Sequence, residues 1–452
     1  MAFLFKARAA AAPTRTLSRL APALVLAAAV ASGPMPASAQ VEVAPLSAPD
    51  VFSGGSRDTG LGGDLWRGSS ADLARAAMPT IGDKPLSPAG RRLAVRVLST
   101  GANAPDGAGA DLSLAAARAR GLLALGEGRA AFTSVERIPN LAAEPALAEV
   151  AAEAALIAGA DDQACRIEAM LTVGRGEIYW LRLRAYCQAI AGQSDAAQLT
   201  MTLANEQARD PIFTRLMLAL TLGADSGAAS SRNGLDLAAS RRLGLTPTTA
   251  GAPPAIAAAL SSPQADAPPP PEMMETDPVR AARLYIRAGQ PDQARIIRQA
   301  LTQDEIPGAR PADLNVLDAL LAIADGQAPG SVLDALVQRG ALNGARSPAQ
   351  VSAVYLQALG APMSPERRAE FASFDIGRFS VSPVRLAALD QAAEAGLKGE
   401  TALIALGIAA DAGPAGPAPP ERAAIIRALR KVGLVEDARA FAIEGVLALY
   451  PR

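Results

Sequence analysis

The two cysteines, Cys165 and Cys187, are the first residues whose spacing suggests chemistry. The glycines of the stretch 172–178 mark a turn between two helix-like runs, and the cysteines lie at equal distances on either side of Gly176. Residues equidistant from the turn of an antiparallel helix pair lie side by side, so we expect a structural disulfide. Two buried free thiols and a redox-active pair are the alternatives, although no C-x-x-C motif is present.

Histidine is absent from the chain, which narrows the remaining chemistry. A Ser-His-Asp triad, a Cys-His pair and a histidine-based metal site all need an imidazole and are therefore excluded. The sequence also lacks S-x-x-K, G-x-S-x-G and glycine-rich phosphate-binding motifs. We therefore expect no catalytic residue, no metal site and no cofactor.

Three carboxylates, Glu272, Glu275 and Asp277, follow the proline run 268–271. Acids this close together could bind a cation weakly. Their position beside four prolines favours a solvated linker instead.

Aromatic residues are only 4% of the chain, yet several gather in one short stretch. Tyr179, Trp180 and Tyr186 could line a groove that binds a peptide, with Arg182 and Arg184 holding its acidic groups. At helical spacing the same aromatics could instead be ordinary core contacts between helices. We take these five residues as candidate protein-binding residues.

The composition indicates the fold class. Half of the 452 residues are apolar, and alanine, the best helix former, supplies much of that half. Valine, isoleucine and threonine form no alternating runs, so we expect an all-α protein. The formal net charge of −1 argues against a nucleic-acid partner.

The first 39 residues are typical of an export signal. An apolar run, 20–31, precedes the small residues of Ala37-Ser38-Ala39, which predict cleavage after Ala39 and a periplasmic location. A retained membrane anchor is the alternative, but the run is shorter than the roughly 20 residues that a spanning helix needs. We expect no stable membrane insertion after cleavage. The positive charge that an export signal has before its apolar run comes here from Lys6, Arg8, Arg15 and Arg19.

Breaks in the apolar periodicity divide the rest of the chain. We expect a signal peptide (1–39), a disordered segment (40–86), a helical-repeat lobe (87–245), a Pro/Ala-rich linker (246–277) and a second lobe (278–452). Within the disordered segment, Trp66 is either a docking point for a partner or an aromatic resting loosely on the folded body. The linker has one short helix, expected at 254–260.

A repeated pattern organises the two lobes. Gly126, Gly159 and Gly192 are 33 residues apart, each ends a helix-like run, and each has alanine five residues later. The pattern returns at Gly289 and Gly433. It predicts a helix, a glycine turn and a second helix that crosses the first closely at the alanine. One such hairpin cannot bury its apolar face alone, so hairpins must stack.

This unit resembles that of the tetratricopeptide family, a 34-residue helix hairpin. The resemblance is clearest in "ARLYIRAGQPDQA", and it departs where the family usually has tryptophan, at Leu181 and Pro278. It implies a superhelix of stacked antiparallel helix hairpins and a scaffold that binds proteins. The chain is also similar to exported alanine-rich helical proteins of Gram-negative bacteria that have no known activity. The positions that match the tetratricopeptide unit are Ala282, Tyr285, Gly289 and Ala294.

The resulting expectation is a non-catalytic periplasmic scaffold that binds a protein or peptide partner in the cell envelope. One alternative is a structural envelope protein that associates with itself. Another is a wall-active enzyme of the lytic transglycosylase type, which would need a catalytic glutamate in a lysozyme-like domain. Glu436 and Glu444 lie instead on a C-terminal hairpin without a cleft signature.

Overall fold

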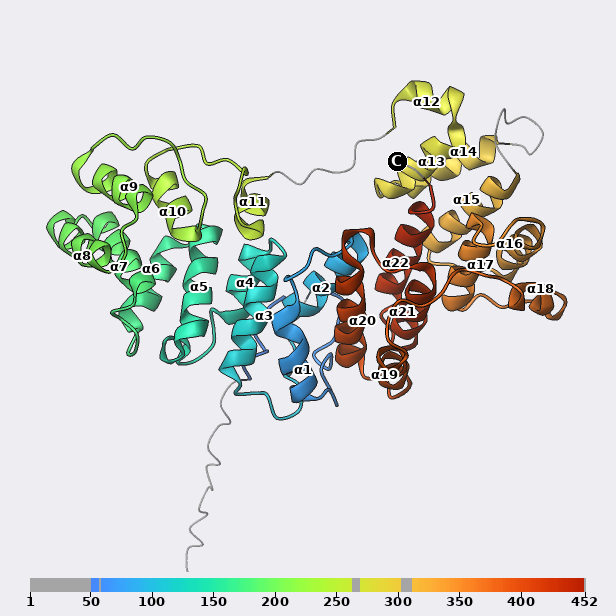
Figure 1. Cartoon of the computed structure of the whole chain (residues 1–452), viewed down its shortest axis with the longest axis horizontal. Helices are drawn as coiled ribbons and strands as arrows, with labels where there is room; N and C mark the ends of the chain where they lie inside the picture. The colour runs from blue at the N-terminus through green and yellow to red at the C-terminus, as the bar shows by residue number, and fades with distance from the viewer. Residues whose placement is uncertain (1–49, 57, 262–268, 302–310, 451–452) are drawn as a thin grey trace, which may run out of the picture. The chain divides into compact units, whose positions relative to one another are not determined.

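The computed structural model describes residues 50–56, 58–261, 269–301 and 311–450, and the expected signal peptide lies outside these ranges. Within them the chain is all-helical, with 22 α-helices, four short 3-10 turns and no strand (Figure 1). The all-α prediction is therefore confirmed. None of the described helices is both long enough and apolar enough to span a membrane.

Eleven α-helices precede the break at 262–268. Their bounds are α1 (Ala71–Ala77), α2 (Pro88–Ser99), α3 (Leu112–Ala124), α4 (Gly128–Val135), α5 (Pro145–Ala158), α6 (Asp161–Met170), α7 (Ile178–Ile190), α8 (Ser194–Gln207), α9 (Pro211–Leu222), α10 (Gly234–Arg242) and α11 (Pro254–Leu260).

Eleven more follow it. They are α12 (Pro271–Thr276), α13 (Pro278–Arg287), α14 (Pro291–Ala300), α15 (Pro311–Ala324), α16 (Gly330–Leu342), α17 (Pro348–Ala358), α18 (Arg368–Ala372), α19 (Pro383–Glu394), α20 (Lys398–Ala412), α21 (Pro419–Lys431) and α22 (Val435–Leu447).

The repeated glycines form the hairpin turns. Gly192, between α7 and α8, has a φ of 76°, a left-handed conformation that glycine adopts without a Cβ clash. Ala197, five residues later, is completely buried against the preceding helix, as the spacing predicts. The same pair of features recurs at the other turns, with glycines 126, 159, 289 and 433 and alanines 131, 164, 294 and 438.

Neighbouring hairpins pack on one another along the chain. The pair α3–α4 packs on α5, α6 packs on α7, and α8 packs on α9. Helix α10 then folds back onto α5. After the linker, α13 packs on α15, α15 on α17, and α17 on the pair α21–α22.

Arginines from one hairpin cap the helix ends of another. Arg91 of α2 donates to the carbonyl of Leu125 at 2.7 Å, and Arg439 of α22 donates to that of Gly326 at 2.9 Å. Arginine presents a planar fork of donors that suits the unpaired carbonyls at a helix C-terminus. The whole chain has four lysines, so arginine, the side chain that can make this cap, supplies most of its positive charge.

The predicted disorder of 40–86 is wrong for the part that the structure describes, from Asp50 onward. Phe52 and Trp66 are completely buried and meet edge to face at 6.0 Å. Arg118 of α3 donates to the carbonyls of Phe52 and Gly54 and so fixes the segment to the helices. Trp66 is thus a core residue, neither an exposed docking point nor a loosely resting aromatic.

The two expected lobes are connected by more than a linker. Helix α2, from the first lobe, packs directly against α20 and α22 of the second (Figure 1). The segment around Trp66 contributes to this junction, because the N–H of Gly399 on α20 donates to the carbonyl of Leu65 at 3.0 Å. The linker therefore joins two parts that are also in contact.

The linker has the predicted helix, α11, and one that was not predicted, α12. Ile256 of α11 is completely buried and belongs to a small apolar cluster with Ile157 and Leu237. Pro271, the last residue of the proline run, begins α12. Glu272 and Glu275 are exposed on α12, and the side chain of Asp277 caps α13 by accepting the N–H of Arg280.

Candidate functional site

The disulfide between Cys165 and Cys187 is present, with the two Cα atoms 5.6 Å apart. It links α6 to α7, so it staples the second helix of one hairpin to the first helix of the next. The equal spacing of the cysteines about the turn therefore predicted their pairing correctly. The bridge fixes the position of α7, which has all five candidate protein-binding residues.

Two of those five residues cannot line a groove. Trp180 is 1% exposed and Tyr186 is completely buried, so neither offers a surface to a partner. Trp180 packs edge to face on Tyr179, and the hydroxyl of Tyr186 donates to Oδ2 of Asp161 at 2.9 Å. Their prediction as partner-binding residues is wrong because the aromatic face of α7 points into the core.

Tyr179 also has an internal partner. Its hydroxyl donates to Oε2 of Glu153 on α5 at 3.4 Å, and the backbone N–H of Gly234 donates to the same carboxylate. Burial raises the pKa of both Tyr179 and Glu153. The pair therefore connects α5, α7 and the start of α10 as an interior contact.

The two arginines of the stretch are ion-paired within the chain. Nε of Arg184 lies 2.7 Å from Oε1 of Glu168, a carboxylate that it shares with Arg175. Arg182 donates to the carbonyl of Ala208 at 3.0 Å, and its Nη1 lies 3.5 Å from Oδ2 of Asp210. Arg182 thus contacts the segment that connects α8 to α9.

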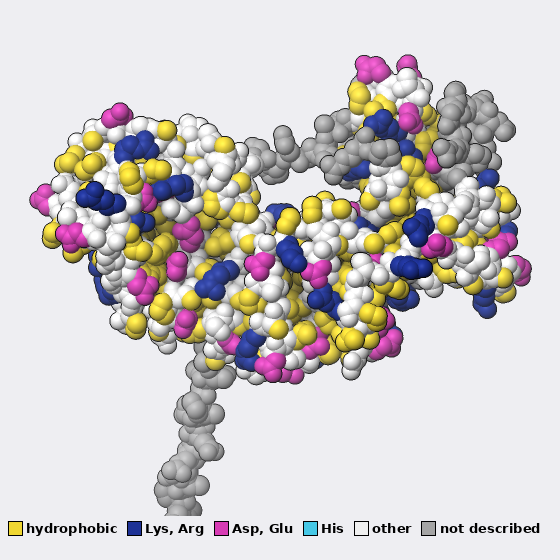
Figure 2. Space-filling view, viewed as in Figure 1, with side chains coloured by type: hydrophobic (Ala, Val, Ile, Leu, Met, Phe, Trp, Pro, Cys, Tyr) yellow, Lys and Arg dark blue, Asp and Glu magenta, His cyan; other side chains and the backbone are white. Residues whose placement is uncertain are grey.

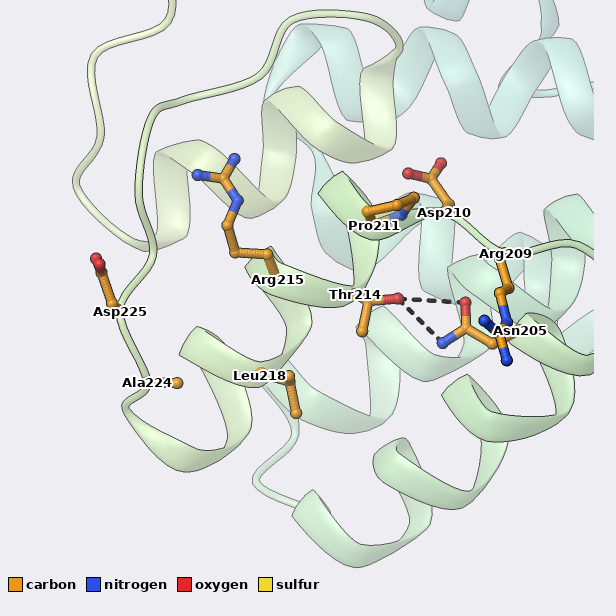
Figure 3. A pocket seen from close by; sticks show the side chains of 9 residues that line it. All are labelled: Asn205, Arg209, Asp210, Pro211, Thr214, Arg215, Leu218, Ala224 and Asp225. Carbon is orange, nitrogen blue, oxygen red and sulfur yellow. Dashed lines mark hydrogen bonds between the residues drawn. The ribbon is translucent and has the colours of Figure 1, made fainter.

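A hollow of about 550 Å³ lies beside that segment, between α8 and α9 (Figure 3). Arg209 and Arg215 project from its two sides, and Thr214 and Leu218 of α9 lie between them. The residues that line it are Asn205, Arg209, Asp210, Pro211, Thr214, Arg215, Leu218, Ala224 and Asp225.

Asp210 caps the N-terminus of α9 and carries a stable negative charge. Its Oδ1 accepts the N–H groups of Ile212 and Phe213, and Arg232 lies 2.9 Å from the same oxygen. Partial burial alone would raise the pKa of Asp210, but the N–H of Phe213 and the guanidinium of Arg232 outweigh burial and lower it. The carboxylate is therefore ionised, neutralised by arginine, and poorly suited to accept a proton.

The hollow retains a surplus of positive charge. Among the described residues, neither Arg209 nor Arg215 forms an ion pair, and Arg209 is exposed. Arg215 donates one hydrogen bond, from Nη2 to the carbonyl of Ala228 at 2.7 Å. Asn205 and Thr214 bond to each other, with Nδ2 3.0 Å from Oγ1. Asp225 also lines the hollow without an ion pair among the described residues, so the unpaired charges of the lining sum to one positive charge, and we expect the rim to favour an acidic ligand.

Apolar side chains form the rest of the surface. Pro211, Leu218 and Ala224 line the hollow, and Leu222 follows on the same face of α9 with 63% of its surface exposed. Figure 2 shows basic and hydrophobic side chains next to one another over the α8–α10 end of the molecule. The arrangement therefore suits a partner with both acidic and apolar groups.

The sequence alone did not predict this hollow. A signal was present, because Pro211, Arg215, Leu218 and Leu222 recur at helical spacing and place apolar and basic groups on one stripe. That stripe does not indicate by itself that α8 leaves it uncovered.

Comparisons with known proteins found no relative of this chain. No family model matches it, and neither does any curated protein or solved structure.

Proposed function

We propose that this protein is an exported, non-catalytic helical-repeat scaffold that binds a protein partner in the periplasm. The observation that carries the proposal is the hollow between α8 and α9, with its unpaired arginines and apolar lining. Guanidinium groups and exposed leucines recognise a partner by charge and burial, without making or breaking a bond.

The packing of the hairpins supports the scaffold architecture. Successive hairpins pack on one another, as the proposed tetratricopeptide-like solenoid of stacked hairpins requires. Such stacks build extended surfaces from residues of several repeats. The hollow uses α8, α9 and the following turn, so it belongs to this class of surface.

The disulfide supports export. A bridge between Cys165 and Cys187 forms and persists in an oxidising compartment, such as the periplasm. The signal peptide that would direct the chain there lies at 1–39, with cleavage after Ala39.

Site-specific photo-crosslinking in cells tests the proposal. A benzophenone amino acid replaces Ala224, which lines the hollow, and in a control it replaces Gln299, an exposed residue of α14. We expect a discrete adduct with one unrelated periplasmic protein from position 224 alone. The adduct should disappear in the variant R209E/R215E and persist in R137E, which reverses an arginine that is 86% exposed on its side chain.

Three results would overturn the proposal. One is the absence of any adduct from position 224, and another is the same adduct from position 299. The third is an adduct that contains only this chain, which would indicate the self-associating structural protein instead.

A further inference from the structure

The sequence contains two Asn-Gly pairs, Asn233-Gly234 and Asn343-Gly344, and the structure places them in different surroundings. The first pair lies at the start of α10, and the second lies in the turn that joins α16 to α17. Asparagine is thermally labile, because the backbone nitrogen of the next residue can attack its side-chain amide. Glycine favours this attack, since it has no Cβ to crowd the nitrogen. Both pairs therefore have the residue types that the reaction needs.

The turn at Asn343 leaves the attacking nitrogen free. The N–H of Gly344 donates to no acceptor among the described residues. Gly344 is exposed, and no described atom beyond its chain neighbours lies within 4 Å of the place where its Cβ would be. The preceding residue, Leu342, has 75% of its surface exposed. Water therefore has access to this turn, and the peptide between Asn343 and Gly344 has room to rotate.

The pair at the start of α10 is held by hydrogen bonds. Asn233 caps the helix, because its Oδ1 accepts the N–H of Asp236 at 2.8 Å. The N–H of Gly234, which is buried, donates to Oε1 of Glu153. Before this pair can react, it must lose both the helix cap and a hydrogen bond to a carboxylate. The fold therefore protects Asn233.

We propose that Asn343 is a site of spontaneous deamidation in the folded protein. The N–H of Gly344 gives its proton to hydroxide, and its nitrogen bonds to Cγ of Asn343. The side-chain nitrogen takes a proton from water and leaves as ammonia, which closes a cyclic succinimide. Water then opens the ring at Cγ to give aspartate, or at the backbone carbonyl carbon to give isoaspartate. The net reaction replaces an amide with a carboxylate and needs no oxidant, reductant or enzyme.

The modification changes the connection between α16 and α17. Beyond Asn343, the N–H of Arg346 donates to the carbonyl of Asp375 at 2.8 Å. Before it, the carbonyl of Gly340 accepts from Nε2 of Gln350 on α17 at 3.1 Å. Isoaspartate lengthens the main chain between these two contacts by one atom and adds a negative charge. We expect the amide of Arg346 to exchange its hydrogen faster in the modified chain.

The test follows both pairs in the full, oxidised chain, held below its melting temperature at mildly alkaline pH. Peptide mapping by mass spectrometry measures the gain in mass at each asparagine, and an isoaspartyl methyltransferase with labelled S-adenosylmethionine detects isoaspartate. We expect both products at position 343. The rate at position 233 should be lower by about tenfold or more, because the nitrogen of Gly234 must first leave Glu153. In concentrated denaturant the two pairs should react at similar rates.

Three variants separate the reaction from its surroundings. G344A adds a Cβ in open space, so it should keep the melting temperature of the wild type and slow the reaction at Asn343. N343Q should not react, because its longer side chain would have to close a larger ring. G176A also adds a Cβ in open space, in another exposed loop, and should leave the rate at Asn343 unchanged.

The proposal fails if position 343 gains no mass in the folded chain, or if both asparagines react there at the same rate. It also fails if G344A reacts as fast as the wild type, or if G176A slows the reaction as G344A does. Unchanged exchange at the amide of Arg346 would overturn the effect on the turn. These measurements need no partner, so their outcome is independent of the crosslinking experiment.

Discussion

Arg96 of α2 and Asp437 of α22 form a partly buried ion pair, with Nη1 2.6 Å from Oδ2 across 341 residues of sequence. Asp437 is 1% exposed, and its ion pair joins α2 to α22. Nearby, the N–H of Ala89 donates to Oε2 of Glu444 at 2.6 Å. The same glutamate accepts from Arg422, so two carboxylates of α22 hold α2 in place.

Removing Arg96 should weaken this junction. In R96A the carboxylate of Asp437 stays buried without its partner, and we expect the free energy of unfolding to fall by about 3 kcal/mol at pH 7. Chemical denaturation measures the loss. R137A, which truncates an arginine 86% exposed on its side chain, should change it by less than about 0.5 kcal/mol.

The R96A effect should also depend on pH. Burial raises the pKa of Asp437 in the folded chain, despite the opposing effect of Arg96. A raised pKa in an acid means that the folded state holds its proton more tightly, so stability is lost as the pH rises above the unfolded value. Because R96A removes an interaction that lowers this pKa, we expect its deficit at pH 4 to be smaller than at pH 7. An equal deficit at both pH values would contradict a charged Asp437 as its cause.

Opening the disulfide should lower stability without unfolding the hairpins. The bridge spans 22 residues, and the chain-entropy estimate for a loop of this size is about 3 kcal/mol. C165S/C187S should therefore melt at a lower temperature than the wild type. Reductant should lower the melting temperature of the wild type and leave that of the variant unchanged. Mass spectrometry without reductant provides the direct check, because two free thiols would refute the bridge.

The local pattern of the sequence was enough to predict the hairpins and the bridge. Gly192 and Ala197 are five residues apart, and Cys165 and Cys187 flank one turn. The contacts that form these features therefore join residues that are close together in the sequence. The same reasoning placed α11 at its observed bounds.

Long-range contacts explain what could not be predicted. Trp66 stands in a stretch rich in glycine and serine, and its composition indicated disorder. Its burial depends on Gly399, more than 300 residues later, which no local pattern connects to it. The hollow at Arg209 and Arg215 was missed for a related reason, since it depends on how α8 and α9 pack.

Arg118 should be essential for the fold of the N-terminal segment. It is 1% exposed and donates to the carbonyls of Leu98, Phe52, Gly54 and Thr100, while its guanidinium lies 5.1 Å from the centre of the Phe52 ring. Burial lowers its pKa to about 10, so it is still protonated at neutral pH.

R118K keeps the charge but loses the planar fork. We expect it to cost about 3 kcal/mol, because one ammonium cannot reach all four carbonyls. Hydrogen exchange should accelerate at the amides of Val51 and Ser56, which bond to Gly109 and Ser99. R120K changes an exposed arginine two residues away and should leave these amides protected. Equal exchange in both variants would show that Arg118 does not fix the segment.

Two glycines of α20 offer a matched test of the junction around Trp66. A Cβ on Gly399 would lie 2.3 Å from Cε3 of Trp66, far inside contact distance, whereas a Cβ on Gly407 would meet no atom within 4 Å. Both sites are helical, so alanine is favoured at each by propensity alone. Any opposite effect must therefore come from the tryptophan or from Ser69, whose Oγ would lie 2.9 Å from the same Cβ.

G399A should lower the free energy of unfolding by about 1–3 kcal/mol, because the indole is overpacked and must move. Its tryptophan emission should shift to the red as Trp66 becomes exposed, while Trp180 contributes a constant background. G407A should raise stability by about 1 kcal/mol and leave the emission unchanged. If G399A also stabilised the protein, Trp66 would not be seated against α20, and the N-terminal segment would not join the two parts of the chain.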